Sequence, residues 1–196
     1  RPLSTYNFGV EAVHELIGRP EDIARFDLAV AVGSDEVPLE VINIAEQPVV
    51  EHKYTSEKCQ TLVRWAWTRR SEDVVFTNGA TDIVLSRAAD LGRRYVSNIP
   101  LIQAAEARIK LAKLAVALAA RLFSTDHTGQ KVLVLPEHAE HVYRFVVSCF
   151  DKKSMGYDHY SRLRILEATI ADEAHVRKVL GSRPGLVQFL VSAPSL

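Results

Sequence analysis

A short apolar run near the start of the chain restricts the possible fold most strongly. Residues 28–32, at the end of the segment EDIARFDLAVAV (21–32), are all apolar, whereas residues 21–25 are mostly polar. A strand that is apolar throughout is typical of a parallel sheet, in which both faces are covered. The sequence contains no second strand of this kind. We therefore expect 28–32 to be one core strand whose sheet needs further strands.

The rest of the sequence predicts a mainly α protein. Two short extended runs, 74–76 and 132–135, each precede a helix and are expected to pair as small strands. We expect a Gly-containing linker at 152–160, followed by three short helices at 161–170, 172–181 and 184–194. Apolar spacing and residues that favour helix ends predict the other helices at 7–18, from Pro20, at 38–44, from Thr55 or Ser56 to 70, at 78–96, from Pro100 to 123, and from 136 to 150.

Composition excludes some classes of function. The 24 Lys and Arg residues balance the 24 Asp and Glu residues, so no overall field attracts nucleic acid or a membrane. There is no apolar run of about 18 residues and no signal peptide, which predicts a cytoplasmic protein with no membrane partner. Cys59 and Cys149 are expected to be buried thiols. Because the chain starts at Arg1 and its only methionine is Met155, we expect a piece of a longer protein.

The sequence lacks the motifs of a self-sufficient enzyme. No G-x-x-x-x-G-K-[ST] phosphate-binding loop (Walker A) occurs, and no apolar run ends in the paired acidic residues of a Mg²⁺-binding strand (Walker B). His138 and His141 share one face of an expected helix, but no third metal ligand follows, which favours a solvated first turn. The local interpretation of Arg25 is a surface arginine at a helix end.

The order of features around Arg25 resembles that in one family. ARFDL (24–28) resembles the Ser-Arg-Phe-Asp-Leu segment of AAA+ ATPases of the MCM (minichromosome maintenance) helicase class, with Ala24 in place of the serine. In that family the segment carries the arginine finger, an arginine that completes the ATP site of a neighbouring subunit. The resemblance therefore implies that Arg25 is catalytic, and that Phe26 anchors the turn in the core.

The likeness continues more loosely to about residue 150. WAWTR (65–69) resembles a Tyr/Trp-Ala-x-x-Arg pattern of the helical lid. EARIKLAKLAVALAA (106–120) resembles the sensor-2 helix, which places Arg108 at the residue that contacts the γ-phosphate. Here Lys110 and Leu111 replace the family's Leu-Glu, so Lys110 is a substitute candidate for nucleotide binding.

The resemblance implies a C-terminal fragment of an AAA+ α/β module. Residues 1–50 would end the core, with one core strand at 28–32; 51–152 would form the lid with sensor 2; and 153–196 would hold a linker and truncated winged-helix-like helices. The full-length protein is expected to form a homo-oligomeric ring, most often a hexamer, that uses ATP and Mg²⁺. It would couple hydrolysis to unwinding or translocation of DNA, which upstream pore elements contact, with the C-terminal tail as a second candidate. The fragment alone is expected to bind neither cofactor and to be inactive.

Besides a degenerate motor, which would have the same fold but no working upstream ATP site, two alternatives remain at this stage. One is an AAA+ remodelling ATPase of the MoxR or magnesium-chelatase type, which also places an arginine before a strand. The other is a non-catalytic helical adaptor with a winged-helix tail, which predicts that Arg25 is unimportant and that 28–32 belongs to a helix.

Overall fold

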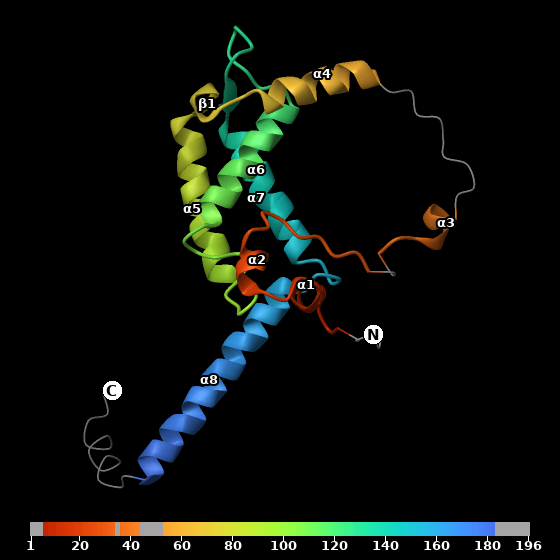
Figure 1. Cartoon of the computed structure of the whole chain (residues 1–196). Coiled ribbons are helices and arrows are strands. Elements are labelled where there is room, and N and C mark those ends of the chain that lie inside the picture. Colours follow the sequence, from red (N-terminus) through yellow and green to blue (C-terminus); the bar gives the residue numbers. More distant parts are fainter. Residues whose placement is uncertain (1–5, 34–35, 44–52, 183–196) are drawn as a thin grey trace.

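The computed structural model describes residues 6–33, 36–43 and 53–182, and in these residues the protein is mainly helical. Helices α5, α6 and α7 pack against one another in pairs and form the centre of the molecule (Figure 1). Helix α4 lies across one end of this centre, and α1 and α2 lie near the other end, where α8 leaves the body (Figure 1). The helices are α1 (Gly9–Ile17), α2 (Pro20–Ala24), α3 (Leu39–Ile42), α4 (Ser56–Trp67), the 3₁₀ helix η1 (Ser71–Asp73), α5 (Asn78–Arg94), α6 (Ala107–Arg121), α7 (Pro136–Phe150) and α8 (Tyr157–Ser182).

Most helix boundaries follow from residues that suit helix ends. Gly18 closes α1 with a φ of 84°, which glycine adopts without a steric cost. Pro20 stands in the first turn of α2, where no N–H is needed. The side chain of Thr55 accepts a hydrogen bond from the Lys58 amide at the start of α4, and Thr77 does the same for Ala80 at the start of α5. These expected starts and ends are confirmed.

The two expected short strands also pair. Strands β1 (Val74–Phe76) and β2 (Val132–Val134) run parallel, with Val74 opposite Val132 and Phe76 opposite Val134. Each strand leads directly into a helix, α5 or α7, and β2 also contacts α6. The pair therefore joins the starts of two central helices.

The predicted core strand at 28–32 is wrong. These residues form neither strand nor helix; Leu28, Ala29 and Ala31 pack partly against the core, whereas Val30 is 53% exposed and Val32 is 66% exposed. Without neighbouring strands in the described part of the chain, the backbone here lacks ladder hydrogen bonds. Instead, the Ala31 carbonyl accepts a hydrogen bond of 2.8 Å from the Ser154 hydroxyl.

Two other element predictions need correction. The long helix begins at Ala107 rather than near Pro100, because residues 100–106 form turns. The two helices expected at 161–170 and 172–181 form a single helix, α8, which has 26 residues. The third expected helix, at 184–194, lies outside the described residues.

The segment at 152–160, expected to be a linker, contributes to the main core. Met155 and Tyr157 are fully buried and Tyr160 is almost so, and they belong to the same apolar cluster as Val10 of α1 and Phe150 of α7. The Tyr157 ring stacks on Tyr95 of α5 at 5.1 Å between ring centres. The beginning of α8 is therefore packed against α1, α5 and α7.

Candidate functional site

The segment around Arg25 lies on the surface beside α6. Arg25 ends α2, and its side chain is 81% exposed, with a surface ion pair of 3.6 Å to Asp22. Ile23, two residues earlier, is fully buried in the core. The backbone near Arg25 is thus anchored while the guanidinium itself is accessible. This position suits a cation that acts on something outside the chain.

The prediction that Phe26 anchors the turn in the core is wrong, because this side chain is 47% exposed. Its backbone, rather than its ring, is held. The Phe26 amide donates to the Ile23 carbonyl at 3.1 Å, and the Phe26 carbonyl accepts a hydrogen bond of 2.7 Å from the Nζ of Lys110. The apolar anchor of this segment is Ile23, which the sequence analysis did not single out.

Lys110 of α6 is buried, with 4% of its surface exposed. Its Nζ donates to the Phe26 carbonyl and to the Leu101 carbonyl, both at 2.7 Å. Burial of the ammonium lowers the pKa of Lys110, although Asp27 and Glu106 favour its charged form. Both acceptors belong to the chain itself, so two of the three hydrogens of the Lys110 ammonium are engaged within the fold.

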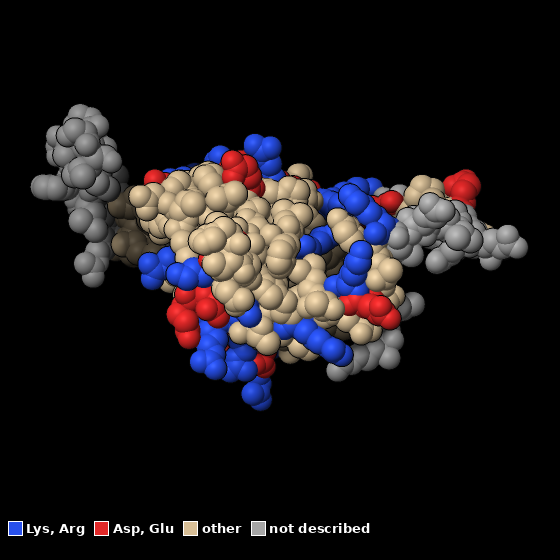
Figure 2. All heavy atoms as spheres, turned by 90° about the horizontal axis from the view of Figure 1, so that it is seen from above, with Lys and Arg blue, Asp and Glu red and all other residues tan. Residues whose placement is uncertain are grey.

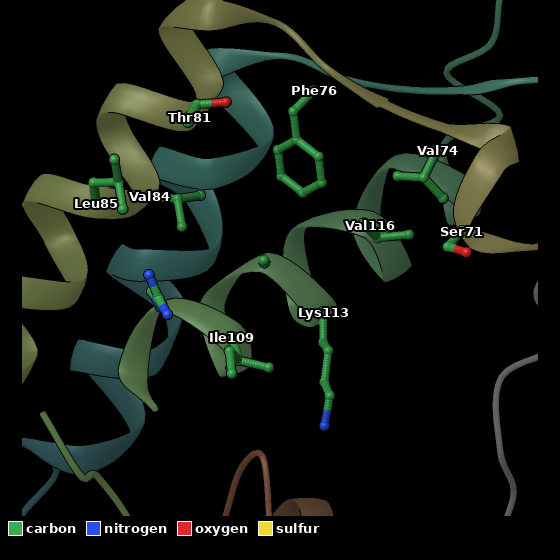
Figure 3. Close-up of a pocket in the computed structure, with 11 residues that line it drawn as sticks. Ser71, Val74, Phe76, Thr81, Val84, Leu85, Ile109, Lys113 and Val116 are labelled. Atoms are coloured by element: carbon green, nitrogen blue, oxygen red, sulfur yellow. The ribbon is translucent and has the colours of Figure 1, made fainter. Parts of the chain in front are cut away.

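Arg108 is exposed, and it lines a cavity of about 780 Å³ between α5, α6 and β1. Lys113, Ser71 and Thr81 also line it. In Figure 3, Phe76 from β1 points into the space between α5 and α6, while Lys113 extends away from Phe76. The other residues that line the cavity are apolar: Val74, Phe76, Val84, Leu85, Ile109, Ala112 and Val116.

The charge of this cavity has one sign. Arg108 and Lys113 are cationic, and no acidic residue belongs to the described lining. A pocket with apolar walls and a few charged groups is typical of a small-molecule site, and this volume suits a ligand of moderate size. The arrangement can accept a flat apolar group together with an anionic group.

Lys113 connects the cavity to the Arg25 segment. Its Nζ lies 3.3 Å from the carboxylate of Asp27, and the same lysine lines the cavity. The three residues predicted from the sequence, Arg25, Arg108 and Lys110, therefore lie around the first half of α6. The structure brings the two segments together across more than eighty residues of sequence. Lys113 was missed because a lysine on an exposed helix face carries no local signal.

Other predicted features have structural roles. Arg69, at the end of the WAWTR segment, donates a hydrogen bond of 2.7 Å to the Gln130 carbonyl and lies over the Trp65 ring. The Trp65 Nε1 donates to the Gly129 carbonyl at 2.9 Å. These bonds attach α4 to the loop before β2, although no residue of α4 is fully buried.

The two histidines expected in a solvated first turn, His138 and His141, are not both exposed. His138 is buried, and its Nδ1 accepts a hydrogen bond of 3.0 Å from the Leu135 amide at the start of α7. Within the described ranges, no group of three or more His, Cys, Asp or Glu residues is placed to hold a metal ion. The expectation of two buried thiols holds for Cys149 but is wrong for Cys59, which is exposed.

The surface in Figure 2 has no continuous basic region. Its centre is uncharged, and Lys and Arg lie around this centre with Asp and Glu among them. On the face that Figure 2 shows, the cations are therefore interspersed with acidic residues rather than clustered. Within the described residues, no helix is both long enough and apolar enough to cross a membrane.

Comparison of the sequence with models of protein families, with curated proteins and with solved structures found no match.

Proposed function

We propose that this chain is the C-terminal portion of an MCM-like AAA+ ATPase, in which Arg25 is an arginine finger and Arg108 contacts the γ-phosphate. The observation that carries the proposal is the contact between the Arg25 segment and α6. The Phe26 carbonyl lies 2.7 Å from the Lys110 Nζ. The turn that carries Arg25 is therefore held beside α6, and Arg108 lies on this helix two residues before Lys110.

Such an arrangement suits phosphoryl transfer. Negative charge gathers on the transferred phosphoryl group in the transition state, and a cation from a neighbouring subunit stabilises it. Arginine is suited to this role because it stays charged and presents a planar set of donors. Arg25 is exposed, and its ion pair within the described residues is a surface pair with Asp22, which is weak enough to exchange for a phosphate.

The cavity beside Arg108 supports the same proposal. Its apolar walls and two cations fit a ligand with a flat ring and an anionic group, as in a nucleotide. The ATP and Mg²⁺ sites of the parent protein would be formed with residues upstream of this chain. Ring formation, DNA translocation and a cytoplasmic location belong to the proposal for that parent protein.

Residues 28–32 do not separate the alternatives. The adaptor predicts a helix there and the AAA+ module a core strand, and these residues form neither. The MoxR or chelatase alternative makes the same use of Arg25, and no observation in the described residues favours it over the helicase class. We therefore retain the helicase class on the ARFDL segment.

The test uses the longer protein from the parent gene. We expect it to hydrolyse ATP with stimulation by DNA, and Arg25→Ala to lower kcat by about 10³-fold or more while ATP still binds. Mixing this variant with a partner that is inactive in its own phosphate-binding loop is expected to restore part of the activity, because the finger acts between subunits.

Arg19→Ala is the matched control, since Arg19 is an arginine at the other end of α2. It is expected to retain activity. Normal turnover by Arg25→Ala would refute the assignment of the finger and favour the adaptor.

A further inference from the structure

Lys110 has an unusual environment for a lysine. Its side chain is 4% exposed, and its Nζ donates to the backbone carbonyls of Phe26 and Leu101, both at 2.7 Å. Phe26 is 84 residues away in sequence, and Leu101 is nine residues away. A buried cation is costly unless its donors are satisfied. One of the two carbonyls that satisfy this ammonium belongs to Phe26, the residue directly after Arg25.

Two features indicate that the bond from the Lys110 Nζ to the Phe26 carbonyl determines where Arg25 is held. The Phe26 ring is half-exposed, and the next apolar contacts with the core after Ile23 begin only at Leu28, which is partly buried. The second link to α6, the pair of Lys113 with Asp27, is exposed, and such pairs contribute little. Lys110 is thus the one buried polar link that the described residues show between the Arg25 turn and α6.

We propose that Lys110 is the positioning residue for Arg25: it fixes the turn that carries this arginine to α6, so that a movement of α6 moves Arg25. This inference rests on the proposed function, which assigns Arg25 its role as an arginine finger. It also gives Lys110 a different task from nucleotide contact. Because Arg108 lies on the same helix, a ligand bound at Arg108 would act on the Arg25 turn through Lys110.

The first test uses the 196-residue chain and requires no enzymatic activity. The amides of Arg25 and Phe26 donate to the Asp22 and Ile23 carbonyls, at 3.2 and 3.1 Å, so their hydrogen exchange reports opening of the turn. In Lys110→Met we expect these two amides to exchange about tenfold faster or more, with the amides of α5 and α7 changed less than about twofold. Methionine keeps an unbranched side chain that is one atom shorter and has no donors.

Lys113→Met is the control, because it lies on the same helix and removes the exposed link to the same segment. It is expected to leave exchange at Arg25 and Phe26 unchanged. If Lys110→Met does not fold, Lys110→Gln is measured instead, because glutamine retains an N–H donor group. We then expect a smaller increase in hydrogen exchange at the Arg25 and Phe26 amides. Unchanged exchange at Arg25 and Phe26, or an equal increase throughout α5 and α7, would overturn the proposal.

The second test separates this inference from the proposed function. In the longer protein, Lys110→Met is expected to lower kcat about tenfold or more while KM for ATP is unchanged, because a displaced finger affects the transition state and leaves ATP binding intact. Because a loss of folded protein would also lower the apparent kcat at unchanged KM, kcat is calculated per folded enzyme, with the folded fraction taken from thermal unfolding of the variant. If Arg25→Ala retains activity but the exchange result holds, the proposed function fails and the link by Lys110 stands; a rise in KM without a fall in kcat would refute the positioning role.

Discussion

At the scale of single residues, charged side chains of this protein are held by partners from distant parts of the chain. Arg94 at the end of α5 pairs with Asp151 and Asp158, and the Tyr95 hydroxyl donates to Asp151 at 2.8 Å. Burial and the nearby Asp151 raise the pKa of Tyr95, so that it stays protonated. The network joins α5 to α8. These polar contacts specify how the helices meet.

A second network, between α5 and α7, predicts a dependence of stability on pH. Arg87 donates to both carboxylate oxygens of Glu140, at 2.9 and 3.3 Å, and Arg144 donates to the same group. The hydrogen bond from Arg87 is the main reason that the pKa of Glu140 is lowered. A carboxylate with a lowered pKa stabilises the fold above its unfolded value of about 4.3, and this stabilisation is lost as the pH falls through the lowered pKa.

We therefore expect Arg87→Met to reduce the free energy of unfolding modestly at neutral pH, because the pair with Glu140 is partly exposed. The difference from the wild type is expected to narrow between about pH 5 and about pH 2, measured by urea unfolding at each pH. Glu140→Gln serves as the control, since it removes the titrating group. A difference that is the same at every pH would contradict this role of Glu140.

At the scale of elements, backbone conformation decides where α8 begins. Gly156 has a φ of 59°, and a Cβ at this residue would lie 2.4 Å from the Cδ1 of Phe8. Its amide donates to the Lys152 carbonyl at 2.7 Å, which closes the loop after α7. The position thus requires glycine for two reasons, its conformation and its close contact with Phe8.

Gly156→Ala is expected to lower the free energy of unfolding by about 2 kcal/mol or more, because both the left-handed backbone and the contact with Phe8 become unfavourable. Gly181→Ala is the matched control: a Cβ there has no atom within 4 Å, and alanine in a helix is better than glycine by about 0.5–1 kcal/mol. Thermal unfolding of both variants would check the opposite signs. Equal stability of Gly156→Ala and the wild type would contradict the described start of α8.

At the scale of the whole molecule, the first helix and the segment around the start of α8 meet in one core. The amide of Gly9 donates to the Ser154 carbonyl at 2.9 Å, and that of Val10 donates to the Met155 carbonyl at 3.1 Å. Phe8 also packs edge-on against Tyr160. The first helix is therefore stabilised by residues near 155, which the sequence analysis expected to be a linker.

This contact predicts the result of truncation. A chain of residues 1–152 lacks Met155, Tyr157 and Tyr160, and removal of each buried side chain of this size costs about 2–5 kcal/mol. Since domains are stable by only about 5–15 kcal/mol, we expect this chain to lose cooperative thermal unfolding or to melt more than about 10 °C lower. A chain of residues 1–165 keeps these side chains and is expected to melt near the full chain. Equal melting of 1–152 would instead support a domain boundary at 152.

Local sequence patterns predicted many elements because their physical causes are local. The bonds of Thr55 and Thr77 at helix starts, the left-handed Gly18 and the apolar runs that pair as β1 and β2 all involve neighbours in sequence or a simple repeat. Continuity of α8 was missed at 170–172, where the sequence has no glycine or proline to end a helix.

By itself, then, the sequence determined the helical class and most helix boundaries, because propensities and apolar spacing act over a few residues. The tertiary structure alone decided that 28–32 joins no sheet, that Phe26 is half-exposed and that Lys110 bonds to the carbonyl beside Arg25. Each of these depends on which groups arrive from elsewhere in the chain. A strand needs a neighbouring strand, and a buried lysine needs hydrogen-bond acceptors. The local sequence pattern around either residue does not show which distant segment supplies that partner.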